Sequence, residues 1–286
     1  MTTTTSREAD DLARLFSGIA VRAGLAILAG AEGIGSRPKA DGSPVTALDE
    51  EAQEIIVGEL GRSLPGVLIV AEEGDARPVR GAGESAFILV DPLDGTRDFL
   101  NGSPEWTVNI ALVDGDRVVA GAMHAPRLGR LFVGGQSAWE VAVEPGRALD
   151  DGLPRRPLRC RTDRATPIAL ESRSHPDPVT ERLTVALGRT ERRKVSSSLK
   201  FALIAAGEAD LHVRAAPLTE WDVAAGDAVV TAAGGAVLAF DGEPLRYGSA
   251  GYRVPPYLVV ADPDAGRALV RRIGGELQTG AAAAVR

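Results

Sequence analysis

The spacing of apolar residues predicts two helices near the start of the chain. Ser6 is a suitable N-cap, and acidic residues follow it where the positive end of a helix dipole would lie. Apolar residues then recur every three or four positions as far as Gly30, which can end a helix. A second helix is expected to open at Thr46, with Ile55 and Leu60 on its apolar face.

After these helices the pattern changes to short apolar runs, which are typical of buried strands. The strands expected from this pattern cover residues 67–70, 87–90, 107–113, 117–123 and 131–133. Asp114-Gly115-Asp116 separates two of them and is a hairpin signal. The sequence therefore predicts a mostly antiparallel sheet, built as a meander.

The second half of the chain alternates between strand and helix patterns. Its expected strands are 168–171, 211–213, 236–240 and 257–260, and its expected helices are 178–187, 198–206, 222–233 and 263–273. A segment rich in Gly, Pro and Asp, residues 144–157, precedes this half. We therefore expect one compact unit with an N-terminal lobe, 1–145, and a C-terminal α/β lobe, 146–286. The predicted class is α/β (α+β), a layered α/β/α/β/α sandwich whose first sheet is antiparallel and whose second is mixed.

Composition and charge narrow the class of protein. The hydrophobic fraction of 44% and the charged fraction of 25% are those of a soluble globular protein. The net charge of −7 argues against binding to a nucleic acid polymer or an anionic membrane, because no global basic field would attract a polyanion. A small anionic substrate can still be captured by a local metal site.

Cysteine usage and the N-terminal segment predict a reduced, cytoplasmic protein. Cys160 is the one cysteine, so the chain can form no internal disulfide, and a cysteine-based zinc site is disfavoured. Cys160 lies in a strand-like run, where a packing role is favoured over a nucleophilic one. The first residues carry no basic region followed by an apolar run, and no secretory signal is expected. We also expect no apolar stretch of the ~18 residues that a membrane helix needs.

The segment from Asp91 to Asp94 is the richest in candidate chemistry. Two carboxylates lie three residues apart just after an apolar strand, Pro92 stiffens the turn between them, and Gly95 permits a sharp bend. Mg²⁺ prefers oxygen ligands, and a pair of ions ~3.5–4 Å apart can stabilise both the attacking and the leaving oxygen of a displacement. Asp91 could bridge two such ions, with Asp94 and the Leu93 carbonyl completing the ligand shells. The alternative is an ordinary turn, since Asp caps its own backbone.

Two other acidic positions favour the metal-site interpretation. Glu72 also follows an apolar strand, and Asp222 begins a helix of small residues that can pack close to another element. Each has a structural alternative. Asp222 could be no more than a helix N-cap, and Glu73 could be solvated surface.

Three segments together resemble a known family. They are Ala-Glu-Glu at 71–73, Asp-Pro-Leu-Asp-Gly-Thr at 91–96 and Trp-Asp-Val-Ala-Ala-Gly at 221–226. The set resembles the lithium-sensitive, Mg²⁺-dependent phosphatase superfamily, which includes inositol monophosphatases, fructose-1,6-bisphosphatases and bisphosphate nucleotidases. Residues 91–102, 105–112, 172–175 and 196–201 are most similar to 3′(2′),5′-bisphosphate nucleotidases of the CysQ type.

The resemblance implies two Mg²⁺ ions and leaves a third, weaker ion open. One ion would be held by Glu72, Asp91 and the Leu93 carbonyl. The second would be held by Asp91, Asp94 and Asp222. Asp49 and Thr96 would orient the attacking water, with Glu72 as a further catalytic residue. Thr46 and Asp49 also form a capping-box pattern, so Asp49 could serve the helix, the reaction or both.

The resemblance also implies a substrate pocket that includes Asp94 and Asp222. The backbone amides of Gly95 and Thr96 would bind the phosphate being cleaved. The expected remaining contacts are Lys39 in a polar loop, Ser197, Ser198 and Lys200 at a helix start with free N–H groups, and His175 beside the base. Surface exposure is the alternative for Lys39, and a structural role is the alternative for His175.

The implied activity is hydrolysis of 3′-phosphoadenosine 5′-phosphate to AMP and phosphate by a metal-activated water. The partner would be a small phosphate ester, with a homodimer left open. An inositol or sugar phosphatase with the same metal mechanism is the first alternative. A metal- or phosphate-binding regulatory protein without turnover is the second, and the arrangement of acids with a threonine around a water argues against it.

Overall fold

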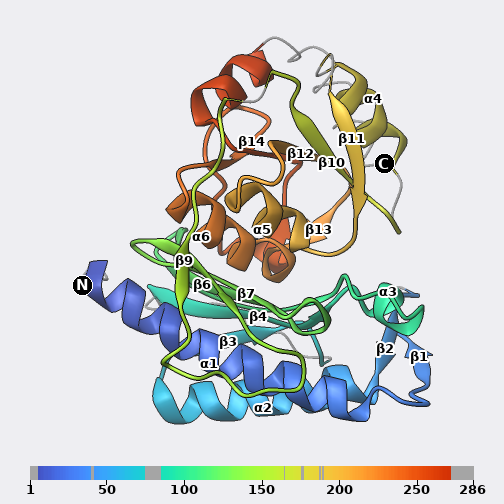
Figure 1. Cartoon of the computed structure of the whole chain (residues 1–286), viewed down its shortest axis with the longest axis vertical. Coiled ribbons are helices and arrows are strands. Elements are labelled where there is room, and N and C mark those ends of the chain that lie inside the picture. Colours follow the sequence, from blue (N-terminus) through green and yellow to red (C-terminus); the bar gives the residue numbers. More distant parts are fainter. Residues whose placement is uncertain are drawn as a thin grey trace.

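The computed structural model describes residues 6–39, 42–74, 85–163, 165–174, 177–186, 188 and 190–271. Helical and sheet layers alternate along the long axis of the molecule (Figure 1). From one end to the other they are α1 (Ser6–Gly30) with α2 (Ala47–Ser63), a seven-stranded sheet, α5 (Leu199–Ala205) with α6 (Ala224–Ala232), a five-stranded sheet, and α4 (Pro178–Ala186) with a helix at 263–271. This order confirms the predicted α/β/α/β/α sandwich.

Both predicted N-terminal helices are present, and α2 starts where it was predicted to start. The apolar face of α1, including Phe16, Ile19 and Ile27, is fully buried against the first sheet and α2. Burial of this stripe stabilises the helix far more than its intrinsic propensity does. In α2, Thr46 is the N-cap and closes a capping box with Asp49.

The composition of α1 corrects one expectation. Arg7–Gly30 is long and apolar enough to cross a membrane, by length and composition only. In the folded chain, however, 50% of its most apolar window is buried within the protein. A core helix of a soluble protein passes the same test, and the apolar face of α1 here packs on the sheet.

The first sheet is the predicted meander, extended at both edges. Its strands, in spatial order, are β3 (Leu68–Ala71), β4 (Ala86–Asp94), β5 (Thr107–Asp114), β6 (Arg117–Ala125), β7 (Arg130–Gly134), β8 (Ala138–Ala142) and β9 (Arg155–Pro157). Only β3 and β4 are parallel neighbours. The strands β8 and β9 were not predicted, and β9 carries the first sheet past residue 145. The division into two lobes stays a prediction.

The second sheet is mixed, as expected. Its order is β11 (Glu191–Val195), β10 (Ile168–Ser172), β12 (Leu211–Arg214), β16 (Tyr257–Val260) and β14 (Ala236–Ala239). The first three strands are parallel, and the pairs that include β16 are antiparallel. The sequence analysis missed β11 because its four exposed residues, Glu-Arg-Arg-Lys, lack an apolar pattern. Charges on an edge strand discourage pairing with other chains.

Short elements complete the fold. They are β1 (Ser36–Pro38) with β2 (Pro44–Thr46), β13 (Leu218–Thr219) with β15 (Arg253–Val254), α3 (Thr96–Leu100), and the 3-10 turns η1 (Pro126–Leu128), η2 (Glu220–Asp222) and η3 (Ala250–Tyr252).

The predicted helix at 222–233 is divided into η2 and α6. Its N-cap is Thr219, and Asp222 closes a capping box with it, so the interpretation of Asp222 as the N-cap itself was wrong. Cys160 is packed near Val230, and burial raises the pKa of its thiol to about 12, as expected of a structural cysteine.

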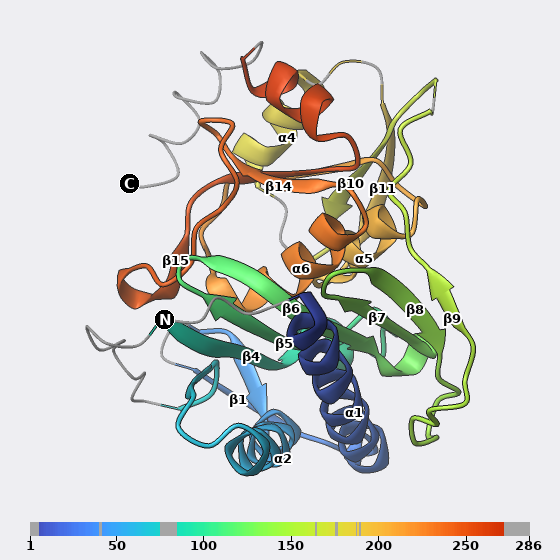
Figure 2. The same cartoon turned by 90° about the vertical axis from the view of Figure 1, so that its left-hand side faces the viewer.

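A pair of glycines lets α6 lie directly on the first sheet. Gly121 on β6 and Gly134 on β7 are cross-strand partners beneath α6 (Figure 2). A Cβ atom at Gly134 would lie 2.4 Å from the Ala228 carbonyl oxygen, and one at Gly121 would lie 2.8 Å from the Ala228 Cβ. Any larger side chain would push α6, and the preceding Asp222, away from the sheet.

We predict that Gly134→Ala destabilises the protein by about 3 kcal/mol, because the added methyl meets helix backbone, which cannot rotate away. Gly61→Ala is the matched control. Gly61 is an exposed residue of α2, and a methyl group added there would meet no atom within 4 Å, so this change should stabilise by about 0.5–1 kcal/mol. Urea unfolding of both variants measures the difference. Equal stability of Gly134→Ala and wild type would contradict the close approach.

Asp227 on α6 is a buried acid with two neutral partners. Its carboxylate accepts hydrogen bonds from Thr231 Oγ1 at 2.9 Å and from the Tyr247 hydroxyl at 2.7 Å. Burial raises the pKa of Asp227 to about 6, although both hydrogen bonds act against the rise. Folding therefore favours the protonated form of this carboxyl.

The raised pKa of Asp227 predicts a pH-dependent stability. The unfolded pKa is about 3.9, so between pH 4 and pH 6 the native state binds a proton that the unfolded state does not. The contribution of Asp227 is favourable below pH 4 and is lost as the pH rises to about 6. Asp227→Asn should thus gain roughly 2–3 kcal/mol relative to wild type between pH 4 and pH 7. Unfolding curves across this range check it, and a constant difference would refute the shifted pKa.

Candidate metal and phosphate site

The ends of β3 and β4 bring acidic residues to one edge of the first sheet. The two strands are parallel, and the backbone N–H of Glu72 donates to the Val90 carbonyl at 3.0 Å, which sets Glu72 beside Asp91. The pairing of β4 with β5 is irregular between Asp91 and Asp94. Gly95 then turns the chain with a φ of 96°, a conformation that favours glycine.

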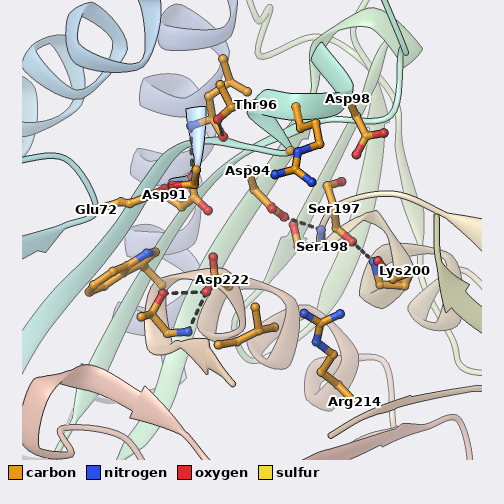
Figure 3. A pocket seen from close by; sticks show the side chains of 18 of the residues that line it. Glu72, Asp91, Asp94, Thr96, Asp98, Ser197, Ser198, Lys200, Arg214 and Asp222 are labelled. Carbon is orange, nitrogen blue, oxygen red and sulfur yellow. Dashed lines mark hydrogen bonds between the residues drawn. The ribbon is translucent and has the colours of Figure 1, made fainter. Parts of the chain in front are cut away.

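Three carboxylates from two elements, Asp91 and Asp94 on β4 and Asp222 on η2, converge at this edge. One oxygen from each of Asp91, Asp94 and Asp222 lies within 4.8 Å of the others (Figure 3). Each carboxylate is held by the backbone. Asp91 accepts from the Leu93 N–H at 3.1 Å, and Asp94 accepts from that of Ser198. Asp222 accepts from the N–H and the hydroxyl of Thr219, at 2.7 and 2.6 Å.

The electrostatics of this cluster call for a cation. Burial raises the pKa of Asp91 well above its usual range, and repulsion from Glu72, Asp94 and Asp222 adds to the rise. Burial and Asp94 likewise raise the pKa of Asp222 to about 6. The Oδ2 atom of Asp91 is buried without a hydrogen-bond partner, although a carboxylate in that position needs one. An all-oxygen donor set with an orphaned anionic atom fits a hard divalent cation such as Mg²⁺.

Glu72 lies next to the three-acid group and is paired with a lysine. Lys39 Nζ contacts Glu72 Oε1 at 2.6 Å and Glu73 Oε1 at 2.7 Å. Burial acts to lower the pKa of Lys39, but the two glutamates outweigh it, and the pKa is raised. Burial and the charge of Glu72 raise the pKa of Glu73 to about 7. Neither Lys39 nor Glu73 is therefore a solvated surface side chain, which was the structural alternative for both.

Asp49 caps α2 and also contacts Thr96, while its part in the reaction stays a prediction. Its Oδ2 caps α2 through the N–H and hydroxyl of Thr46, at 2.9 and 2.6 Å. Its Oδ1 accepts from Thr96 Oγ1 at 2.9 Å, and the same hydroxyl lies 3.1 Å from the Leu93 carbonyl oxygen. The capping box thus fixes the orientation of an acid that contacts Thr96.

These residues line one cavity of about 380 Å³. The predicted residues that line it are Lys39, Glu72, Asp91, Leu93, Asp94, Gly95, Thr96, Ser197, Ser198, Lys200 and Asp222. Asp49 does not line the cavity and reaches it through Thr96. His175 lies outside the described residues.

Cations form the side of the cavity away from the acids. Lys200 and Arg214 are both buried, and the guanidinium of Arg214 points into the cavity (Figure 3). Lys200 Nζ donates to the carbonyl oxygens of Val195, at 3.4 Å, and Ser197. Burial lowers the pKa of Lys200 to about 8, although Asp94 acts against the fall. Two of its three N–H groups are engaged, which leaves one for an anion.

The serine segment differs from its predicted geometry. We expected free N–H groups at a helix start, but the N–H of Ser196 donates to Glu105 at 2.9 Å and that of Ser198 donates to Asp94. The Ser198 hydroxyl joins Thr107, at 2.7 Å, and Asn109, at 3.0 Å. These groups tie the α5 start to the first sheet. Ser197, with a φ of 56°, occupies the strained turn between them.

Asp98 and Arg214 are among the cavity residues that the sequence analysis missed. Asp98 is buried and accepts from the Ser174 hydroxyl at 2.5 Å, and Arg214 ends the buried strand β12. A signal for Arg214 did exist, since an arginine in a short apolar strand needs an anionic environment. Asp98 carried no such signal, because acids in an amphipathic first helical turn are common.

Comparisons with known proteins agree on one family. The model of the inositol monophosphatase family matches residues 9–278. The chain is 36% identical over 212 residues to the 3′(2′),5′-bisphosphate nucleotidase CysQ of Escherichia coli K12, covering 73% of this chain and 81% of that protein. It is 31% identical over 202 residues to the fructose-1,6-bisphosphatase/inositol-1-monophosphatase of Thermotoga maritima, covering 70% of this chain and 72% of that protein.

A solved structure extends the likeness to the fold. The structure of CysQ from Bacteroides thetaiotaomicron, described as a bacterial member of the inositol monophosphatase family, superposes with a TM-score of 0.76. It is 34% identical and covers 87% of this chain and 97% of that chain. With the family model matching nearly its whole length, this chain belongs to the inositol monophosphatase family.

Proposed function

We propose that this protein is a Mg²⁺-dependent phosphomonoesterase that hydrolyses 3′-phosphoadenosine 5′-phosphate to AMP and phosphate. The observation that carries the proposal is the convergence of one buried and two half-buried carboxylates in a cavity whose opposite side is cationic. Acids of this kind suit metal-assisted attack on one phosphate, and the cations suit a second anionic group. The similarity to CysQ nucleotidases supports the choice of a nucleotide.

The metal assignment follows the family resemblance. We propose that Glu72, Asp91 and the Leu93 carbonyl hold one Mg²⁺, and that Asp91, Asp94 and Asp222 hold a second. A third, weaker ion remains an option near Thr96. When bound, Mg²⁺ lowers the pKa of a coordinated water and neutralises charge that develops on phosphate oxygens.

The chain itself orients the attacking water in this proposal. The Thr96 hydroxyl hydrogen is directed at the Asp49 and Leu93 oxygens, so the hydroxyl can only accept a hydrogen bond from water. The Glu72 carboxylate is a second acceptor. A water that donates one hydrogen bond to the Thr96 hydroxyl and one to the Glu72 carboxylate would turn a lone pair toward the phosphorus. The backbone amides of Gly95 and Thr96 would hold the phosphate in line for attack.

A count of charges favours a substrate with two phosphates. The cavity lining contains five carboxylates, Glu72, Asp91, Asp94, Asp98 and Asp222, and five cationic side chains, Lys39, Arg97, Lys200, Arg214 and Arg253. These cancel, so two Mg²⁺ ions would leave the site with an excess of about four positive charges. A phosphate monoester carries about −1.5 to −2 near pH 7. Two of them neutralise the site, whereas one leaves half the excess.

The cations away from the acids are the proposed contacts for the second phosphate. Lys200 has one N–H group to offer, and Arg214 can bind two phosphate oxygens at once. In this proposal Ser197 and Ser198 also contact the substrate, near Lys200. His175 stays a predicted contact of the base. The reacting phosphate would lie near Asp94 and Asp222.

The cellular setting is proposed from composition. A single packed cysteine and a half-buried N-terminal helix suit a reduced cytoplasmic enzyme. The net negative charge suits action on a small molecule and not on a nucleic acid polymer. A homodimer stays a prediction.

A sugar bisphosphatase is the second candidate. The charge count also fits a sugar with two phosphates, and the Thermotoga maritima relative is named as a fructose-1,6-bisphosphatase/inositol-1-monophosphatase. Substrate selection separates the two, because the reacting phosphate would meet the same acids in both.

We predict that Asp94→Asn keeps the fold and lowers kcat on the order of 10²- to 10³-fold, since it removes one charge from the proposed metal shell. The same change relieves carboxylate repulsion, so without metal the variant should melt no lower than wild type. Phosphate release with Mg²⁺, together with melting curves in a chelator, measures both effects. A chelator should also stop the wild type, and added Mg²⁺ should restore it. Normal turnover by Asp94→Asn would refute the assignment.

We predict that 3′-phosphoadenosine 5′-phosphate has a higher kcat/KM than fructose 1,6-bisphosphate and inositol 1-phosphate. Binding of the nucleoside and the second phosphate would hold the reacting phosphate in line. Initial rates at fixed Mg²⁺ give the three values. A sugar or inositol phosphate that is tenfold better, about 1.4 kcal/mol in transition-state stabilisation, would overturn the nucleotidase proposal alone. No phosphate release from any substrate would favour a binding protein without turnover.

A further inference from the structure

The segment 247–253, here called the strap, is anchored beside the proposed metal ligand Asp222. Glu220 is fully buried, and its two carboxylate oxygens accept the backbone N–H groups of Gly248 and Ser249, each at 2.8 Å. The Ser249 hydroxyl donates in turn to the Arg253 carbonyl oxygen at 2.8 Å. One buried carboxylate thus fixes the path of the strap on its way to the cavity.

The strap contains a strained residue directly before Arg253. Tyr252 has a φ of 53°, which is rare outside glycine, and is 5% exposed. Its ring packs 6.0 Å from that of Phe87 and 6.4 Å from that of Trp221, measured between centroids. Packing of this kind is needed to hold the conformation. Arg253 follows as the cross-strand partner of Thr219, the residue that holds Asp222.

Arg253 is exposed and lines the cavity. Within the described ranges, no acidic side chain pairs with its guanidinium, and this separates it from its neighbours. Arg246, just before the strap, pairs with Asp116, and Arg173 pairs with Glu105. The anchored strap therefore places Arg253 at the cavity, where its charge is available to a ligand.

We propose that Arg253 determines specificity by binding the second phosphate of the substrate, and that Glu220 is its positioning residue. The inference rests on the proposed function, since it concerns the same cavity. A guanidinium binds phosphate through two parallel hydrogen bonds, which requires a fixed orientation as well as charge. The strap supplies that orientation, and Arg253 supplements Lys200 and Arg214 from the strap side.

The test compares 3′-phosphoadenosine 5′-phosphate with adenosine 3′-monophosphate, which share the reacting phosphate and the base. Arg253→Ala should lower the preference for the bisphosphate, the ratio of the two kcat/KM values, at least tenfold, mostly through KM. Arg253→Lys should show a preference between those of wild type and Arg253→Ala, because lysine keeps the charge but lacks the paired N–H donors of the guanidinium. Arg246→Ala is the matched control, from the same region but outside the cavity lining, and should keep the wild-type preference.

A double-mutant cycle tests Glu220. Glu220→Gln, whose amide cannot accept both N–H groups, should lower the preference in the wild-type background but not in Arg253→Ala. Ser249→Pro offers a second route if Glu220→Gln does not fold. Ser249 has a φ of −66°, which proline adopts, and the change removes one N–H donor to Glu220 together with the hydroxyl that donates to the Arg253 carbonyl oxygen. A purely structural effect would lower both substrates equally and persist in Arg253→Ala.

Three outcomes would overturn the inference. A preference retained in Arg253→Ala would remove Arg253 as a contact while leaving the proposed function intact. An equal loss for both substrates would assign Arg253 to the base or the reacting phosphate. A wild-type enzyme without any preference for the bisphosphate would overturn the proposed substrate, and this inference with it.

Discussion

Repulsion among closely spaced carboxylates is the constraint around which this structure is organised. Asp91, Asp94 and Asp222 bring anionic oxygens within 4.8 Å of one another, where Asp94 and Asp222 raise the pKa of Asp91, and Asp94 raises that of Asp222. An apolar core would expel such a group or protonate it. Here the chain holds each acid with backbone N–H donors, which favour the charged form but cannot cancel the repulsion. A cation bound among these acids would favour their charged forms.

The positions of these acids depend on contact between the first sheet and the helix layer of α5 and α6. The glycine pair at Gly121 and Gly134 removes the side chains that would separate α6 from the sheet, and η2 then carries Asp222 to the strand ends. At the start of α5, the N–H of Ser198 reaches across to Asp94. Asp94 and Asp222 are thereby positioned by packing between elements that are far apart in sequence. Loss of that packing would change the site before it changed the secondary structure.

The extent to which sequence predicts this site follows from the same geometry. Acids directly after apolar strands could be identified because strand ends meet at a sheet edge, and Asp91 and Asp94 lie there as expected. The layered fold was predicted from the helical spacing of apolar residues and from the short apolar runs that are typical of strands. The edge strand β11 was missed since its exposed residues are charged, and the serine N–H groups were misjudged because their partners, Asp94 and Glu105, are about a hundred residues away. Local patterns carry no information about which distant carboxylate takes a donor.

Two of the unpredicted cations, Arg214 and Arg253, have a common origin in the chain, which bears on how such a family changes substrate. The acids come mainly from the first sheet, whereas Arg214 and Arg253 come from the second half of the chain. Interactions with the reacting phosphate can therefore stay fixed while cations around the rest of the ligand vary. A metal site alone cannot select among phosphate esters, because it meets the same group in each. Selection has to come from the side chains that face the remainder of the molecule, and those are fixed by buried anchors such as Glu220 and not by the acid motifs.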